Sequence, residues 1–167
     1  MKVIIYGATG MIGQGAVRAC LNDPAVEAVL AVGRTATGLQ HPKLKELMML
    51  DLADYSHFDA ALAEYDACFF CLGTTVTGKT EPEYRRVTYG FTMAAAETLL
   101  RLNPQMTFVY VSAEGADSSE KGPLMWARVR GELENVLLRM PFKGVYILRP
   151  AFIQPMAANN PKPPPTA

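Results

Sequence analysis

A glycine-rich turn near the start of the chain, Gly7-Ala8-Thr9-Gly10-Met11-Ile12-Gly13, constrains the fold more than any other feature. It follows a short apolar run at 3–6, and apolar residues recur at helical spacing after it. A buried strand, a glycine turn and a helix in this order are typical of dinucleotide-binding folds. Gly7 permits the tight turn, Gly10 lets the backbone approach a pyrophosphate, and Gly13 lets the helix pack closely on the strand.

The start of the helix after this turn is the expected phosphate site. Its free N–H groups and its dipole would face an anion. We therefore expect Thr9, Met11 and Ile12 to contact the cofactor together with the three glycines. The alternative is a glycine-rich β–α turn that binds no ligand.

Length and charge narrow the class of protein. A chain of 167 residues suggests one domain. Lys plus Arg and Asp plus Glu both number 16, which argues against nucleic acid or an anionic membrane as partner. No apolar run is long enough for a membrane span, and the N-terminus enters a strand directly instead of showing a signal peptide. Three cysteines, an odd number, favour a reducing compartment, and we expect a cytoplasmic protein.

Strand and helix patterns alternate along the chain. This alternation predicts an α/β fold with a doubly wound parallel sheet of about six strands in the order 3-2-1-4-5-6. We expect a domain over residues 1–155 and a proline-rich tail over 156–167, which could lead to further C-terminal structure. The expected strands are 2–6, 26–32, 47–50, 67–72, 107–112 and 145–148, and the expected helices are 11–21, 56–63, 80–102 and 124–139. Two of these helices should each bury one stripe of side chains. In the helix at 80–102 the stripe is Val87, Phe91, Ala94, Thr98 and Leu102. In the helix at 124–139 it is Val129, Leu133, Val136 and Leu137.

Arg34 stands at the end of the second expected strand. In dinucleotide folds an acidic residue here hydrogen-bonds the adenosine ribose 2′-hydroxyl. The planar guanidinium of Arg34 suits a 2′-phosphate instead. The sequence therefore predicts NADP(H) as the preferred cofactor, with NAD(H) also possible. The alternative is a solvated surface arginine.

Two other strand ends offer cofactor contacts. Asp51-Leu52 closes the third strand, beside the expected adenine, although Asp51 could equally cap the next helix. Leu72-Gly73-Thr74 follows the fourth strand, close to the expected central ribose and phosphates.

Cys68 and Cys71 have the CxxC spacing of redox and metal motifs. On a strand, residues three apart point to opposite faces, so we interpret both as core residues. His41 and His57 lack partners at ligand spacing, and we expect both on the surface.

Five short stretches resemble the atypical short-chain dehydrogenase/reductases, most closely the oxidoreductase Tat-interacting protein group and its bacterial relatives of the NAD-dependent epimerase/dehydratase type. The resemblance covers residues 1 to about 155. It implies a Rossmann fold, NADP(H) binding, and oxidation or reduction of alcohols and carbonyls by a Ser, Tyr and Lys set. The stretches are Gly7–Gly13, Val32-Gly33-Arg34, Cys71-Leu72-Gly73-Thr74-Thr75, Val111-Ser112-Ala113-Glu114-Gly115-Ala116-Asp117 and Val129-Arg130-Gly131-Glu132-Leu133-Glu134.

The chain departs from this family at the catalytic pair. The Tyr-x-x-x-Lys motif falls on Trp126-Ala127-Arg128-Val129-Arg130, so Trp126 replaces the tyrosine and Arg130 the lysine. An indole N–H only donates hydrogen bonds, and an arginine does not release its proton. Arg130 could still hold the nicotinamide ribose. Ser112 matches the third catalytic position, although it could instead be a turn serine.

Two functions remain open at this point. The chain could be an NADP(H)-dependent oxidoreductase in which Tyr84, or a water ordered by Ser112, supplies the proton. Alternatively, it could be a non-catalytic NADP(H)-binding module that acts through a protein partner. Helix geometry places Trp126 and Arg130 on one face, which favours Trp126 lining the cleft over core packing. The substrate, the partner and the oligomeric state do not follow from the sequence.

Overall fold

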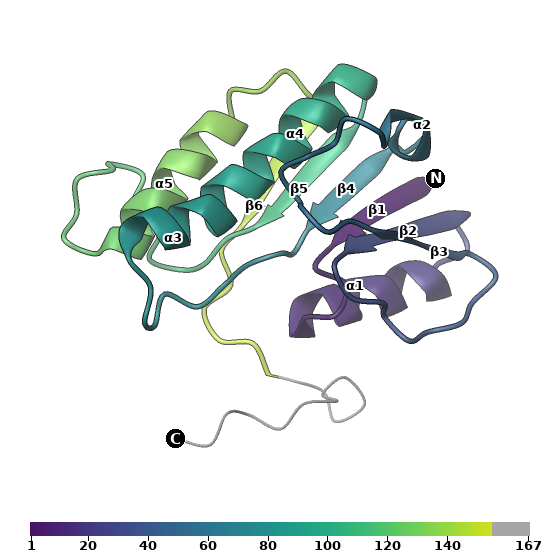
Figure 1. The fold of residues 1–167 in the computed structure, drawn as a ribbon, viewed down its shortest axis with the longest axis horizontal. Coiled ribbons are helices and arrows are strands. Elements are labelled where there is room, and N and C mark those ends of the chain that lie inside the picture. Colours follow the sequence, from purple (N-terminus) through teal and green to yellow (C-terminus); the bar gives the residue numbers. More distant parts are fainter. Residues whose placement is uncertain (155–167) are drawn as a thin grey trace.

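The computed structural model describes residues 1–154, which form one six-stranded sheet with its helices (Figure 1). All neighbouring strands are parallel, and their order, β3-β2-β1-β4-β5-β6, confirms the predicted topology. The expected tail over 156–167 lies outside the described residues. The strands are β1 (Lys2–Tyr6), β2 (Ala28–Gly33), β3 (Leu44–Met48), β4 (Ala67–Phe70), β5 (Thr107–Val111) and β6 (Gly144–Leu148), and the helices are α1 (Met11–Asn22), α2 (Asp59–Leu62), α3 (Glu81–Arg85), η1 (Arg86–Gly90), α4 (Phe91–Leu102) and α5 (Met125–Leu137).

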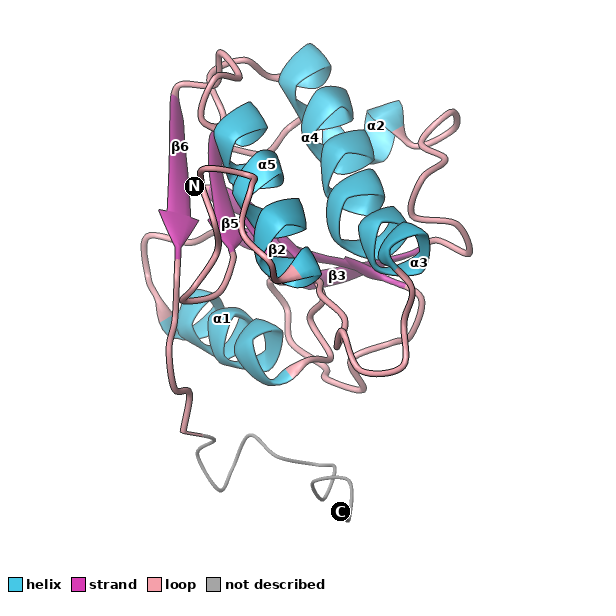
Figure 2. Cartoon of the chain, turned by 90° about the vertical axis from the view of Figure 1, so that its left-hand side faces the viewer, coloured by secondary structure: helices cyan, strands magenta, loops and turns pink. Residues whose placement is uncertain are grey.

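The two faces of the sheet are covered unequally. Helix α1 lies on one face, whereas α2, α3, α4 and α5 lie on the other (Figures 1 and 2). Successive residues of a strand point to opposite faces. Ile4 and Tyr6 therefore enter the core under α4 and α5, while Val3 and Ile5 pack against α1. Parallel strands buried in this way read as continuous apolar runs, and this is why β1 is visible in the sequence.

The strands around the centre of the sheet end at one level. Tyr6, the last residue of β1, pairs with Val32 of β2 on one side and with Phe70 of β4 on the other. The loops after these strands consequently leave the sheet side by side. This edge is where ligands bind in doubly wound folds.

Two predicted elements differ from the structure by more than two residues at one end. The third strand was expected at 47–50 but runs from Leu44 to Met48, and Leu50 is fully exposed beyond it. Strand β3 is an edge strand with charged residues, so an apolar run does not mark it. The helix expected at 56–63 contains only Asp59–Leu62, because Asp54 accepts local hydrogen bonds from the backbone and side chain of Ser56 and forms a turn there.

The long helix expected at 80–102 begins as predicted but is interrupted. Thr80 and Glu83 form the expected capping box. A π-helical turn, η1, then separates α3 from α4. Each inserted residue rotates the following helix face by about 100°. Of the expected stripe only Phe91 is buried, whereas Val87, Ala94 and Leu102 pack partly buried against the core. The buried positions of η1 and α4 are Thr88, Phe91, Thr92, Ala95, Ala96 and Leu99.

Helix α5 follows its prediction closely. Val129, Leu133 and Leu137 are fully buried, while Val136 is only half-buried. Within residues 1–154, none of the helices combines the length and apolar character that crossing a bilayer requires.

Candidate cofactor site

The glycine turn has the geometry expected of a phosphate loop. Gly7 adopts a φ of +72°, and a Cβ added there would lie 2.7 Å from the backbone nitrogen of Leu72. A Cβ on Gly13 would lie 2.0 Å from the carbonyl oxygen of Gly7, so only glycine allows α1 to approach the strand this closely. At Gly10, the residue before α1, the nearest atom to an added Cβ is 3.3 Å away. That atom is the carbonyl oxygen of Gly7, and no other atom outside the neighbouring residues lies within 4 Å, so the rest of the space beside Gly10 is open to a ligand.

The first turn of α1 provides donors for an anion. Its leading N–H groups have no partner within the helix. The α1 cap carries no side-chain hydrogen bond, and the first turn contains no acidic residue. The carbonyl of Thr9 is held by the side-chain amide of Gln14 at 2.9 Å. The helix start can therefore receive a phosphate.

Arg34 lies in a small pocket after β2, and sequence reasoning missed the carboxylate beside it. This Arg34–Glu46 pocket is lined by the glycine turn, by the end of β2, and by Glu46 and Met48 of β3. Leu72 also lines it. The Glu46 carboxylate accepts a hydrogen bond of 2.6 Å from the backbone N–H of Thr37 and so orders the loop after β2. Strand pairing could have indicated this residue only if the start of β3 had been predicted correctly.

Asp51 and Leu52 lie in different environments. Asp51 is exposed and lines a second pocket together with Arg34, while its Oδ1 accepts the N–H of Ala53 at 2.9 Å. Leu52 is buried in the core. Only Asp51 therefore presents its side chain at the strand ends. The Asp51 side chain closes a local turn with the backbone two residues further on. It does not cap α2, which begins at Asp59.

Arg130 reaches from α5 to the end of β4. Its Nε donates to the hydroxyl oxygen of Tyr84 at 3.0 Å, and its Nη1 donates to that of Tyr110 at 3.2 Å. Its Nη2 points toward Gly73, where an added Cβ would lie 3.8 Å away. Both tyrosines are buried, and burial raises the pKa of Tyr110. The guanidinium is thus held beside Gly73, and Thr74, the next residue, is half-buried in the same loop.

Ser112 belongs to a buried network that the sequence did not reveal. Its hydroxyl donates to the carboxylate of Glu134, which is itself buried on α5. Arg149, just after β6, makes a short ion pair with the same carboxylate, and its Nη2 also donates to Ser118 at 2.8 Å. The hydrogen bond to Glu134 raises the pKa of Arg149. The single hydroxyl proton of Ser112 is therefore already committed to a carboxylate.

Trp126, in the first turn of α5, packs its indole ring against the loop after β5. A Cβ added to Gly115 would lie 3.2 Å from the indole Cη2, so the ring covers this glycine. Trp126 is half-buried, and neither buried cluster of the described chain includes it. The indole therefore contacts the loop at the carboxyl end of β5 and does not pack in the core.

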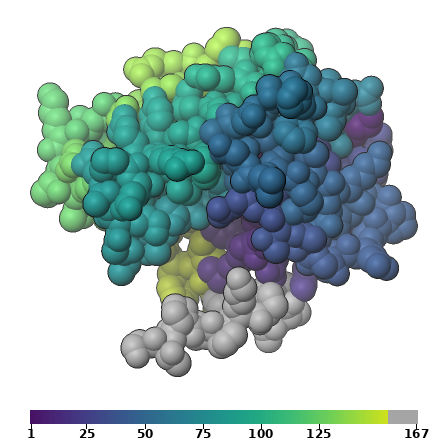
Figure 3. Space-filling model, viewed as in Figure 1, coloured from purple at the N-terminus to yellow at the C-terminus, as the bar shows by residue number. Residues whose placement is uncertain are grey.

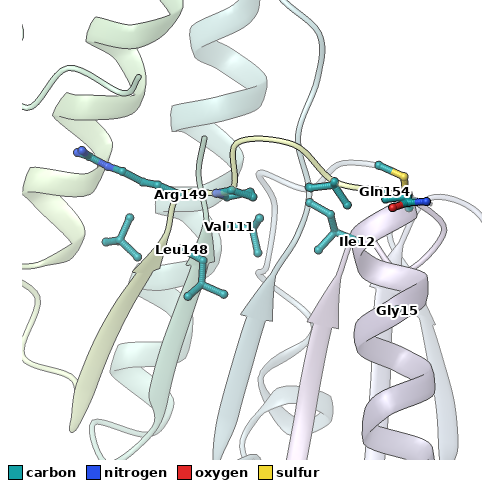
Figure 4. A pocket seen from close by; sticks show the side chains of 10 residues that line it. Ile12, Gly15, Val111, Leu148, Arg149 and Gln154 are labelled. Atoms are coloured by element: carbon teal, nitrogen blue, oxygen red, sulfur yellow. The ribbon is translucent and has the colours of Figure 1, made fainter. Parts of the chain in front are cut away.

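An apolar pocket of about 580 Å³ opens between α1 and the ends of β5 and β6 (Figure 4). Met11, Ile12 and Gly15 form one wall, and Val111 and Leu148 form the other. Arg149 contributes its aliphatic stem, while its guanidinium turns away toward α5 and Glu134 (Figure 4). The cavity can therefore hold an apolar group beside the glycine turn.

The cysteines and histidines do not form a reactive centre at these strand ends. Cys68 is fully buried and Cys71 is partly buried, and both are free thiols. Burial raises the pKa of Cys71 to about 12 and that of Cys68 well above its usual value, so neither provides a thiolate near neutral pH. His41 and His57 are exposed, as expected.

Comparison with curated proteins finds a group of fungal relatives. The chain is 28% identical over 154 residues to "Protein FMP52, mitochondrial" of Candida albicans, covering 90% of this chain and 66% of the relative. It is 27% identical over 158 residues to "Protein fmp52-1, mitochondrial" of Aspergillus terreus, covering 91% and 66%. The chain thus spans 66% of the length of these relatives.

These names overturn the expected cytoplasmic location, because the relatives are named as mitochondrial proteins. An odd cysteine count indicates a reducing compartment but does not distinguish one such compartment from another.

Solved structures share the fold. A short chain dehydrogenase from Burkholderia cenocepacia in complex with NADP superposes with a TM-score of 0.76 at 14% identity, covering 98% of this chain and 77% of that chain. UDP-glucuronic acid 4-epimerase from Bacillus cereus in complex with NAD gives 0.72 at 17% identity, covering 90% and 56%.

Residues 2–122 match the family described as semialdehyde dehydrogenase, NAD binding domain. The matched segment contains the glycine turn, Arg34 and the end of β5. The chain belongs to this family of NAD(P)-binding Rossmann domains.

Proposed function

We propose that the chain binds NADP(H) in preference to NAD(H) and belongs with the atypical short-chain dehydrogenase/reductases. The observation that carries the proposal is the close approach of α1 to β1 at Gly13 and Gly7, which leaves the space beside Gly10 open. The N–H groups of Met11, Ile12 and Gly13 would hold the pyrophosphate, since the N–H of Gly10 already donates to the carbonyl of Gly7. Arg34 would bind the 2′-phosphate, since its side chain makes no hydrogen bond or ion pair with the rest of residues 1–154.

The remaining contacts extend along the strand ends. Asp51 would contact the adenine, and Gly73 and Thr74 would lie beside the central ribose and phosphates. Arg130 would hold the nicotinamide ribose, because Tyr84 and Tyr110 already fix its guanidinium next to Gly73. The nicotinamide itself supplies a hydride when the cofactor is bound.

Two candidate activities differ in whether a side chain of the protein supplies a proton to the substrate. In the first, the protein reduces a carbonyl or oxidises an alcohol, and Tyr84 passes the proton near Arg130. In the second, it binds NADP(H) without turnover and acts through a partner. The second is favoured by the network at Ser112, whose hydroxyl proton is committed to Glu134, and by Trp126 in place of the catalytic tyrosine.

One experiment separates these activities. Purified protein is titrated with NADPH while the fluorescence of the bound nicotinamide is recorded, with Gly10→Val as the control for the phosphate loop. Carbonyl compounds are then screened for loss of nicotinamide absorbance. Saturable binding with no turnover supports the module, and turnover that is lost in Tyr84→Phe supports the oxidoreductase. Absence of saturable binding would contradict both.

A further inference from the structure

A second pocket adjoins the Arg34–Glu46 pocket, because Arg34 lines both. Its volume is about 550 Å³, and Arg34, Leu50 and Asp51 form one side of it. The other side comes from the segment that enters α3 and from η1. In the space-filling view, the segment near residue 50 (blue) meets this segment (teal) on the face shown (Figure 3). The residues from the second side are Gly78, Lys79, Glu83, Arg86, Val87 and Phe91.

The two carboxylates of this pocket are already engaged. Asp51 accepts the backbone N–H of Ala53 at 2.9 Å. Glu83 accepts both the N–H and the hydroxyl of Thr80 at 2.8 Å, and these hydrogen bonds lower its pKa. Lys79 lies near enough to Glu83 to lower that pKa further. Both acids therefore serve local turns and caps.

The two guanidiniums, in contrast, are not neutralised. Over residues 1–154, neither Arg34 nor Arg86 forms an ion pair or a side-chain hydrogen bond. The neighbouring Arg85 differs, because it pairs with Glu132 and its guanidinium lies 4.8 Å from the centre of the Tyr89 ring. Two unpaired guanidiniums that line one pocket favour an anion in it.

We propose that Arg86 is a second specificity residue, which binds the 2′-phosphate of the adenosine from the side opposite to Arg34. This inference rests on the proposed function and deepens it. Arg34 lines both the Arg34–Glu46 pocket and this one, so a phosphate bound at Arg34 would adjoin the cavity that Arg86 also lines. Asp51 lines the same cavity and is the expected adenine contact. Cofactor preference would then depend on two elements far apart in the sequence, the end of β2 and η1.

The test uses 2′,5′-ADP and 5′-ADP, which differ in the 2′-phosphate and do not involve the nicotinamide half of the site. Calorimetric titration of Arg86→Ala should show affinity for 2′,5′-ADP about tenfold weaker than wild type, with 5′-ADP within about twofold. Arg86→Lys should retain part of the affinity, because it keeps the charge but loses the planar fork. Arg85→Gln is the matched control: it removes the same charge one residue away and should change neither ligand.

Three results would overturn the inference, and each has a different meaning. If Arg86→Ala binds 2′,5′-ADP normally while Arg34→Ala does not, Arg86 has no role and the proposed function stands. If both ligands weaken equally, Arg86 contacts the adenosine and not the 2′-phosphate. If wild-type protein binds neither 2′,5′-ADP nor NADPH, the proposed function itself fails.

Discussion

The two halves of the strand-end crevice are built in different ways. Around β1 to β3 the phosphate site is made of backbone, with glycines that allow close approach at Gly7 and Gly13 and a helix start that donates N–H groups, and Arg34 is the side chain added to it. Around β4 to β6 it depends on side chains that meet from separate elements, as Arg130 does with Tyr84 and Tyr110. The first half keeps the features of a dinucleotide site, and the second half carries the departures from the catalytic pattern. We therefore expect cofactor binding to be separable from catalysis in this chain.

The largest effect is expected at the glycines. Gly13→Val should destabilise the protein by at least about 3 kcal/mol, because its Cβ would overlap the carbonyl of Gly7. Gly10→Val should fold, since residue 10 has a φ of −77° and a ψ of 165°, but it should lose NADPH binding. Thermal unfolding and NADPH titration measure both effects, and Gly15→Ala, where an added Cβ meets no atom within 4 Å, is the control. A Gly10→Val protein that binds NADPH normally would place the phosphates elsewhere.

The next largest effect is expected in the half of the crevice around β4 to β6. Trp126→Tyr combined with Arg130→Lys should raise turnover on a suitable carbonyl by about 10² to 10⁴, the usual contribution of a general acid. Affinity for NADPH should change only modestly. The control is Trp126→Phe with Arg130→Lys, which restores the lysine without a phenol. High wild-type activity that survives Trp126→Phe would show that the proton comes from another group.

A smaller effect tests the side-chain network. Glu134→Ala leaves Arg149 and the Ser112 hydroxyl without their shared partner, and should destabilise the protein by about 2–3 kcal/mol. This is less than for a fully buried pair, because Arg149 is partly exposed and can be hydrated. Glu132→Ala, which removes the half-exposed pair with Arg85, should cost at most about 1 kcal/mol in chemical denaturation. Equal losses from the two substitutions would show that the Ser112 network does not stabilise this half.

The sequence predicted the fold where strands are buried on both faces. The apolar runs of β1, β4 and β5 mark them, and their alternation with helices leads to the observed strand order. The edge strand β3 was displaced because it carries charged residues, and the π-turn η1 could not be foreseen from a period of 3.6. Topology depends on the apolar pattern, whereas exact bounds depend on tertiary context.

In the candidate site, too, local features could be predicted from the sequence and contacts between distant residues could not. The glycine turn is a local feature, so its residues are contiguous and its geometry follows from the motif. Glu46 beside Arg34, and Glu134 between Ser112 and Arg149, come together only through strand pairing and helix packing. A single sequence carries no signal for contacts between residues so far apart in the chain.

The central claim is that Arg34, in the half of the crevice that the glycine turn builds, selects NADP(H). The most direct measurement is the affinity of wild-type protein and Arg34→Ala for NADPH and NADH. We expect the wild type to prefer NADPH. Arg34→Ala should lose about 1.5–3 kcal/mol of NADPH binding, roughly ten- to hundredfold, because one charge-assisted phosphate contact is removed. Its affinity for NADH should hardly change. Equal binding of the two cofactors by the wild type would contradict the account.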